Sequence, residues 1–180
     1  MNKITIYLLA IITMVNSCSS CKKNTTDSNG LPAATQTGAN TFGFLLNGQP
    51  WTPQGNNGTA NLSLYYDATF SGGVFNLSAY RNTSTTNGSR QSIVIYGDTI
   101  QTPLKIILPN KNKFGLNYWN ELKGCSYDTS DSTTKILSGF FDIQKIDKLN
   151  HIFSGQFEII FTNNVCDTIK ITSGRFDLKF

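Results

Sequence analysis

From Thr41 to the C-terminus the chain consists of short runs in which apolar and polar residues alternate, separated by Gly, Asn, Ser and Pro. Alternation with a period of two is typical of strands that bury one face. No segment sustains the 3.6-residue period of a helix. Good helix formers are also scarce, because Glu occurs twice and Ala seven times, whereas the chain holds 19 Asn, 16 Ser and 21 Thr. These features predict an all-β fold.

A six-residue pattern recurs in the C-terminal third, at Ser138–Ile143, Ser154–Ile159 and Ser173–Leu178. In each copy a Gly, a Phe and an aliphatic residue occupy alternate positions and share one face of a strand. The spacing between copies suits an antiparallel meander of three strands. Glycine on the inward face indicates a close approach of backbone. In the strand that ends with the last copy, the apolar residues change from odd positions (Ile169, Ile171) to even ones (Phe176, Leu178), which predicts a β-bulge near Thr172 and Ser173.

Further strands are expected upstream, and Asn47-Gly48 after Thr41–Leu46 is typical of a type I′ hairpin turn. Trp51 is expected to close one end of the core. Phe114–Leu122 is either a strand or a short helical turn. The fold predicted for residues 41–180 is a single antiparallel β-sandwich of roughly eight to ten strands, with a small closed β-barrel as the alternative. The other strands expected in this domain are Thr59–Tyr66, Val74–Tyr80, Gln91–Tyr96 and Leu104–Leu108.

The N-terminus has the features of an export signal. Lys3 precedes an apolar run over Ile4–Val15 that is too short to span a bilayer but suits the core of a signal peptide. The following Val-Asn-Ser-Cys18 resembles a bacterial lipobox, and this resemblance implies cleavage before Cys18 and acylation of its thiol. Cys21 is the alternative acylation site. Residues 1–17 are therefore predicted to be a lipoprotein signal peptide.

Residues 18–40 are predicted to be the acylated cysteine and a flexible tether. The segment is rich in Ser, Thr, Asn, Gly and Ala, with Leu31 as its one large hydrophobic residue. Such a composition offers little apolar surface to bury. The expected partner of this region is a membrane, reached through the N-terminal lipid.

Cys125 and Cys166 remain within the β domain. In an exported protein such a pair is expected to form a disulfide. Two unpaired buried thiols are the alternative. No metal site is expected, since His151 is the only histidine and the domain has no second cysteine pair.

Both ends of the mature chain resemble small uncharacterised cell-envelope lipoproteins of the Bacteroidota. The resemblance rests on the lipobox, the polar segment after it, Phe44–Trp51 and the ending Cys166–Phe180. It implies a lipid-anchored protein of the outer membrane with no established activity. Ser19–Lys23 departs from the acidic export tag of surface lipoproteins in that phylum, so the periplasmic and surface sides both stay open.

No catalytic constellation is found in the sequence. His151 follows Asn150 in an expected hairpin turn, where a solvated histidine is usual. The carboxylates Asp142, Glu158 and Asp177 recur at one offset and could cluster on the outer face. Nearby Lys and Arg residues favour a charge-balanced surface instead. We therefore expect no enzyme activity and no cofactor.

Two function classes remain. The first is a structural or interaction module that presents its loops to another envelope protein. The second is a carbohydrate or small-ligand binder that uses Tyr118 and Trp119, with help from Tyr65-Tyr66, because flat rings beside amide groups can stack on sugars. Solvent exposure of the rings discriminates between the two classes. Nucleic acid is not an expected partner, because the charge of +4 is scattered rather than clustered.

Overall fold

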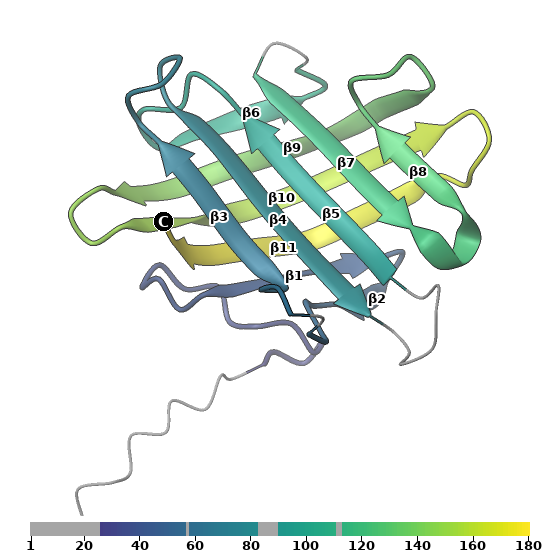
Figure 1. Cartoon of the computed structure of the whole chain (residues 1–180), viewed down its shortest axis with the longest axis horizontal. Helices are drawn as coiled ribbons and strands as arrows, with labels where there is room; N and C mark the ends of the chain where they lie inside the picture. The colour runs from purple at the N-terminus through teal and green to yellow at the C-terminus, as the bar shows by residue number, and fades with distance from the viewer. Residues whose placement is uncertain (1–25, 57, 83–89, 111–112) are drawn as a thin grey trace, which may run out of the picture.

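The structure is a computed structural model that describes residues 26–56, 58–82, 90–110 and 113–180. These residues form two antiparallel sheets of six and five strands, packed face to face with their strands running obliquely to one another (Figure 1). The predicted antiparallel β-sandwich is confirmed, with eleven strands in the described residues instead of eight to ten. The closed barrel is wrong, because each sheet ends in edge strands that pair on one side only.

The six-stranded sheet carries the predicted meander, which is confirmed as three consecutive antiparallel strands (Figure 1). In spatial order the sheet consists of β2 (Gln49–Trp51), β1 (Thr41–Leu46), β11 (Ile169–Lys179), β10 (Ile152–Asn163), β9 (Thr134–Asp147) and β6 (Leu104–Leu108).

The five-stranded sheet lies in front of the meander in Figure 1. A single 3-10 turn, η1 (Glu121–Lys123), separates its last two strands, so the ambiguous segment Phe114–Leu122 contains both a strand and the start of a turn. The spatial order is β3 (Leu62–Asp67), β4 (Val74–Asn82), β5 (Arg90–Gly97), β7 (Phe114–Asn120) and β8 (Cys125–Asp128).

Two local predictions about the backbone are confirmed. Asn47 and Gly48 both have positive φ angles, 50° and 83°, as a type I′ turn between β1 and β2 requires. The pairing of β11 shifts register between Thr172 and Arg175, and Ser173 in between has a φ of 53°. This bulge lets the apolar residues of β11 face the core on both sides of the change in parity.

The glycines of the repeated pattern lie where the strands leave no room for a side chain. A Cβ atom on Gly139 would sit 2.1 Å from the carbonyl oxygen of Glu158, and one on Gly155 would sit 2.0 Å from that of Asp142. The predicted close approach of backbone is therefore confirmed.

Aromatic rings join the two sheets. Phe141 of β9 stacks on Phe75 of β4 with ring centroids 5.3 Å apart, and on Phe176 of β11 at 5.1 Å. Trp51 is fully buried, as expected, and its indole Nε1 donates a hydrogen bond of 2.9 Å to Gln91 of the opposite sheet. The indole therefore contributes both apolar area and a satisfied polar group to the core.

The predicted boundary between tether and domain at residue 40 is wrong, because residues 26–40 pack against the sandwich. Leu31 is fully buried. The Asp27 carboxylate lies 2.9 Å from the Arg175 guanidinium. Asp177, only 1% exposed, accepts hydrogen bonds from the Thr35 hydroxyl and from the backbone N–H groups of residues 37, 38 and 39. Arg175 and Asp177 of β11 therefore hold residues 26–40 in place, although the composition of that segment offers few apolar contacts.

Candidate functional site

The outer face of the five-stranded sheet carries a row of side chains that crosses four strands. Tyr65 of β3 pairs with Asn76 of β4, Asn76 pairs with Tyr96 of β5, and Tyr96 pairs with Gly115 of β7. Residues in register on neighbouring strands point to the same side of a sheet. The row therefore brings two tyrosine rings to either side of one amide side chain.

Local hydrogen bonds hold the Tyr65 end of the row. The Tyr65 hydroxyl donates to Oδ2 of Asp67 at 3.3 Å, while Oδ1 accepts from the Thr69 backbone and hydroxyl, both at 2.7 Å. The hydrogen bonds from Thr69 hold the pKa of the Asp67 carboxyl below its ordinary value, so the acceptor stays charged at neutral pH. The Tyr65 side chain is 59% exposed, and Phe70 in the following turn is 63% exposed.

The Tyr96 ring lies over Gly115 of the neighbouring strand. A Cβ atom at Gly115 would sit 2.1 Å from Cζ of Tyr96 and 2.4 Å from its hydroxyl oxygen. Because glycine has no side chain, the ring can rest on the backbone of β7 while Tyr96 remains half-buried.

A cleft of about 790 Å³ opens beside this row, at the end of the sandwich where β4 begins and β5 ends. The buried rings Phe75 and Phe114 contribute to its lining, and Thr134 and Ile136 extend the lining onto β9 of the other sheet. Its lining thus combines large apolar surfaces with a few groups that can form hydrogen bonds, as ligand pockets do. Besides these residues, the aromatic and polar side chains that line it are Tyr65, Phe70, Asn76, Tyr96, Asp98, Asn110, Lys113, Thr129, Ser130 and Lys135.

The structure separates the two residues predicted to bind a sugar. Tyr118 points inward and is fully buried, so its ring cannot stack on a ligand and the prediction for this residue is wrong. Burial raises the pKa of its hydroxyl to about 12. Trp119 points outward and is 52% exposed. Together with Arg90, Ser92 and Glu121 it lines a second hollow of about 360 Å³.

The alternation of β3 separates Tyr65 from Tyr66 in the same way. Tyr66 is buried, and its hydroxyl donates to the carbonyl oxygen of Ile100 at 2.8 Å. Only Tyr65 of this pair therefore remains available to a ligand.

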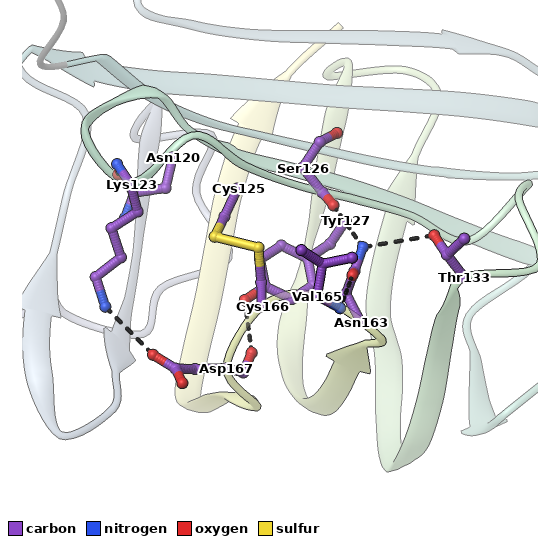
Figure 2. The surroundings of a disulfide bond; sticks show 10 residues. All are labelled: Asn120, Lys123, Cys125, Ser126, Tyr127, Thr133, Asn163, Val165, Cys166 and Asp167. Atoms are coloured by element: carbon purple, nitrogen blue, oxygen red, sulfur yellow. Dashed lines mark hydrogen bonds and ion pairs between the residues drawn. A yellow bond between two sulfur atoms is a disulfide. The ribbon is translucent and has the colours of Figure 1, made fainter.

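The predicted disulfide between Cys125 and Cys166 is present (Figure 2). It joins β8 of the five-stranded sheet to the loop between β10 and β11 of the six-stranded sheet. The Tyr127 hydroxyl donates to the backbone carbonyl of Asp167 beside it, and Nδ2 of Asn163 donates to the carbonyl of Ser126 at 2.9 Å. The bond therefore belongs to a structural junction between the sheets. The predicted acylation sites Cys18 and Cys21 lie outside the described residues.

Asp142, Glu158 and Asp177, for which a cluster is the less favoured interpretation, do not form a metal site. Asp142 lies on β9 beside Gln156 in the register, Glu158 pairs with Phe140, and Asp177 is used to hold residues 35–39. Within the described ranges there is no group of three or more His, Cys, Asp or Glu side chains that could hold a metal ion. His151 lies in the turn before β10 with its ring 5.3 Å from that of Phe180.

Sequence reasoning missed Asn76, Tyr96 and Gly115. Tyr96 follows the strand alternation and so has a recognisable outward parity, but its place beside Tyr65 depends on how β3, β4 and β5 pair. The described residues contain no helix that could cross a membrane. Comparison with protein-family models, with curated proteins and with solved structures gives no match. What this sandwich binds is therefore inferred from its own residues.

Proposed function

We propose that this chain is a lipid-anchored protein of the bacterial cell envelope that binds a carbohydrate, without catalysis, on the outer face of its five-stranded sheet. The observation that supports it most directly is the row in which Tyr65 and Tyr96 flank Asn76 beside the cleft. Aromatic rings stack on the apolar C–H face of a pyranose, and an amide both donates to and accepts from sugar hydroxyls.

Support for binding rather than reaction comes from the charged groups. The Asp67 carboxylate is occupied by hydrogen bonds from Tyr65 and Thr69. Most glycosidases hydrolyse the glycosidic bond with two carboxyl groups that flank it. Among the described residues that line the cleft, Asp98 is the only carboxylate. The described lining of the cleft therefore offers one acidic group where the common glycosidase mechanism uses two.

The proposed location rests on the lipobox-like Val-Asn-Ser-Cys18 and the apolar run before it. Because residues 26–40 pack on the sandwich, only seven residues lie between Cys18 and Thr26. Even fully extended, this stretch spans at most about 30 Å. The anchor would thus keep the domain near the membrane surface, where envelope polysaccharides are within reach.

A protein-binding module is the second candidate, and exposed apolar residues on the other sheet favour it. Ile107 on the edge strand β6 and Leu137 on the neighbouring β9 are both more than half exposed. Exposed apolar side chains next to an open strand edge are suited to contact with another protein.

Thermal unfolding of the full chain with soluble xylan, mannan, glucan and peptidoglycan fragments tests carbohydrate binding. A ligand of the native state raises the unfolding midpoint by mass action. We expect at least one glycan to raise it, and Tyr65→Ala and Tyr96→Ala to remove the rise. Leu149→Ala, at an exposed position in the turn between β9 and β10, is the matched control and should keep the rise. If no glycan shifts the midpoint, the carbohydrate proposal fails and a protein-binding module becomes the better explanation of the structure.

The anchor is tested by growing cells with a clickable fatty acid and measuring its incorporation into the chain. Cys18→Ser should abolish the label and release the protein from membranes, whereas Cys21→Ser should leave both unchanged. Label lost only in Cys21→Ser would move the acylation site to Cys21. No label in the wild-type chain would overturn the anchor.

A further inference from the structure

We propose that the carbohydrate is an extended, neutral polysaccharide chain, bound along its length by two subsites at opposite ends of the five-stranded sheet. This inference rests on the proposed function and adds the class of ligand to it. The first subsite is formed by Tyr65, Asn76 and Tyr96. The second is the hollow beside Trp119, which is separated from the first subsite by the middle of the sheet.

The strand register sets the separation of the two subsites. Tyr96 pairs with Gly115 on β7, and Trp119 lies four residues further along the same strand on the same outward face. At about 3.3 Å per residue this is roughly 13 Å along the strand. Tyr65 lies three strands away from β7, so the line from Tyr65 to Trp119 crosses the sheet obliquely. One pyranose ring cannot reach both subsites.

The second subsite has its own aromatic and polar groups. Trp119 lines it together with Arg90, Ser92 and Glu121. The Arg90 guanidinium lies 4.3 Å from the centre of the Tyr80 ring, and the Arg90 backbone N–H donates to Oε2 of Glu121 at 3.2 Å. In such a site the indole ring can stack on a sugar, while the guanidinium donates hydrogen bonds to the sugar hydroxyls and the carboxylate accepts them.

The strip of sheet between the subsites is polar but almost uncharged. Its central row runs from Ser63 through Ser78, Val94 and Asn117 to Asp128 on the edge strand. Asp128 is the one charged residue of this described row, and its carboxylate accepts a hydrogen bond of 3.1 Å from the Asn117 amide. Hydroxyl and amide groups without net charge match a ligand that is itself neutral and rich in hydroxyls.

The charge pattern separates this ligand from the other extended polymers. A nucleic acid or an acidic polysaccharide needs cations along its whole path. Lys113 and Lys135 line the cleft and Arg90 lines the second hollow, but the described central row between them carries no Lys or Arg. A protein partner gains from apolar anchors at the centre of its contact, and there the row has only the half-buried Val94. A neutral polysaccharide is therefore the occupant that this face suits best.

An oligosaccharide ladder tests the inference. The full chain, in a detergent without a sugar headgroup, is titrated calorimetrically with the di- to hexasaccharides of whichever neutral glycan raises its unfolding midpoint. For the wild-type chain we expect affinity to rise with length and then level off once both subsites are reached. Trp119→Ala should weaken binding of the hexasaccharide about tenfold and abolish the dependence of affinity on length. Trp119→Phe, which keeps a ring, should restore most of the dependence on length.

Fluorescence gives an independent readout, because the chain has two tryptophans and Trp51 is fully buried. Acrylamide should quench Trp119 in the free protein, and the hexasaccharide should protect Trp119 more strongly than the disaccharide does. In Trp119→Phe the remaining fluorescence, which comes from Trp51, should change neither with acrylamide nor with the oligosaccharides.

The outcomes distinguish the two proposals. If oligosaccharides bind with an affinity that does not depend on length, or if Trp119→Ala binds the hexasaccharide as the wild type does, the second subsite is wrong and the carbohydrate function stands. If an acidic oligosaccharide binds more tightly than its neutral counterpart, the proposed neutral ligand is wrong. If no oligosaccharide binds, both proposals fail together.

Discussion

The Tyr96 ring rests on the backbone of Gly115, one strand away, where a Cβ atom would come within 2.1 Å of it. The glycine thus sets the position of an aromatic ring in the candidate site. The two residues depend on each other. The Tyr96 ring can lie against β7 only where the neighbouring residue has no side chain, and a glycine that no ring covered would weaken the strand.

Gly115→Ala should displace the Tyr96 ring and reduce glycan affinity about tenfold, the effect of losing one good aromatic contact. The unfolding midpoint should change by only a few degrees, since the ring lies on the outer face of the sheet and can move aside. Calorimetric titration measures the affinity. In the double variant with Tyr96→Ala the loss should equal that of Tyr96→Ala alone. Additive losses would show that Gly115 acts independently of the ring.

Tyr118→Phe should leave glycan affinity unchanged and keep or slightly raise the free energy of unfolding. Among the described residues, the buried Tyr118 hydroxyl has no partner with the geometry of a hydrogen bond. Removing a buried polar group without a partner costs nothing and removes its desolvation penalty. Tyr118→Ala should instead cost about 3–5 kcal/mol, because it empties a large core position. Urea unfolding measures both values. A fall in affinity in Tyr118→Phe would contradict the inward orientation of this residue.

Asp177→Asn should destabilise the protein near neutral pH and much less in acid. Burial raises the pKa of the Asp177 carboxyl, but hydrogen bonds from Thr35, Thr37, Gly38 and Ala39 outweigh burial and hold the pKa below its ordinary value. A lowered pKa in the folded state stabilises the protein above the unfolded-state pKa of about 3.9. This contribution disappears as the pH falls through the lower, folded-state pKa.

Unfolding midpoints from pH 2 to pH 7 measure this effect. The difference between the wild type and Asp177→Asn should be largest above about pH 5 and shrink towards pH 2. Thr35→Ala, which removes one donor, should shift the midpoint in the same direction by less. A difference that is constant over the whole range would show that the carboxylate charge is not what holds residues 35–39.

Loss of the Cys125–Cys166 disulfide should lower the free energy of unfolding by about 4 kcal/mol in the chain-entropy model, given a sequence separation of 41 residues. Urea unfolding of Cys125→Ser, Cys166→Ser and the double variant measures it, and all three should be similar because each removes the same bond. Lys123→Ala is the control. It removes a salt bridge to Asp167 between two exposed side chains, so the urea midpoint should hardly change. Three unequal losses would point to a role for a single cysteine outside the bond.

Much of the fold could be predicted because it depends on local rules. The alternation along the chain predicts strands, Asn47-Gly48 predicts its hairpin turn, and the change of parity before Ser173 predicts the bulge. The pairing of Cys125 with Cys166 followed from their being the only two cysteines of the predicted domain. In each case the physical cause lies within a few residues or in a count, so no knowledge of the folded arrangement was needed.

The start of the domain could not be predicted, because what holds residues 26–40 comes from the far end of the chain. Asp177 is about 140 residues away from the backbone donors that it accepts from. By composition alone the segment offers little apolar surface, so the sequence predicts a domain that begins at residue 41, whereas the packed structure begins by residue 26. The buried carboxylate of Asp177 holds residues 35–39 by hydrogen bonds, whereas apolar side chains within the segment contribute little.

The candidate site was half predicted for a related reason. An aromatic pair such as Tyr118-Trp119 must place one ring on each face of a strand, but which ring meets solvent depends on what covers the strand. The site itself depends on register across four strands, which brings Tyr65, Asn76 and Tyr96 into one row. By itself the sequence determined the all-β class, the disulfide and the backbone features that local patterns encode. Only the tertiary structure decided which aromatic rings share a face, because long-range strand pairing is fixed by the packing of the whole core.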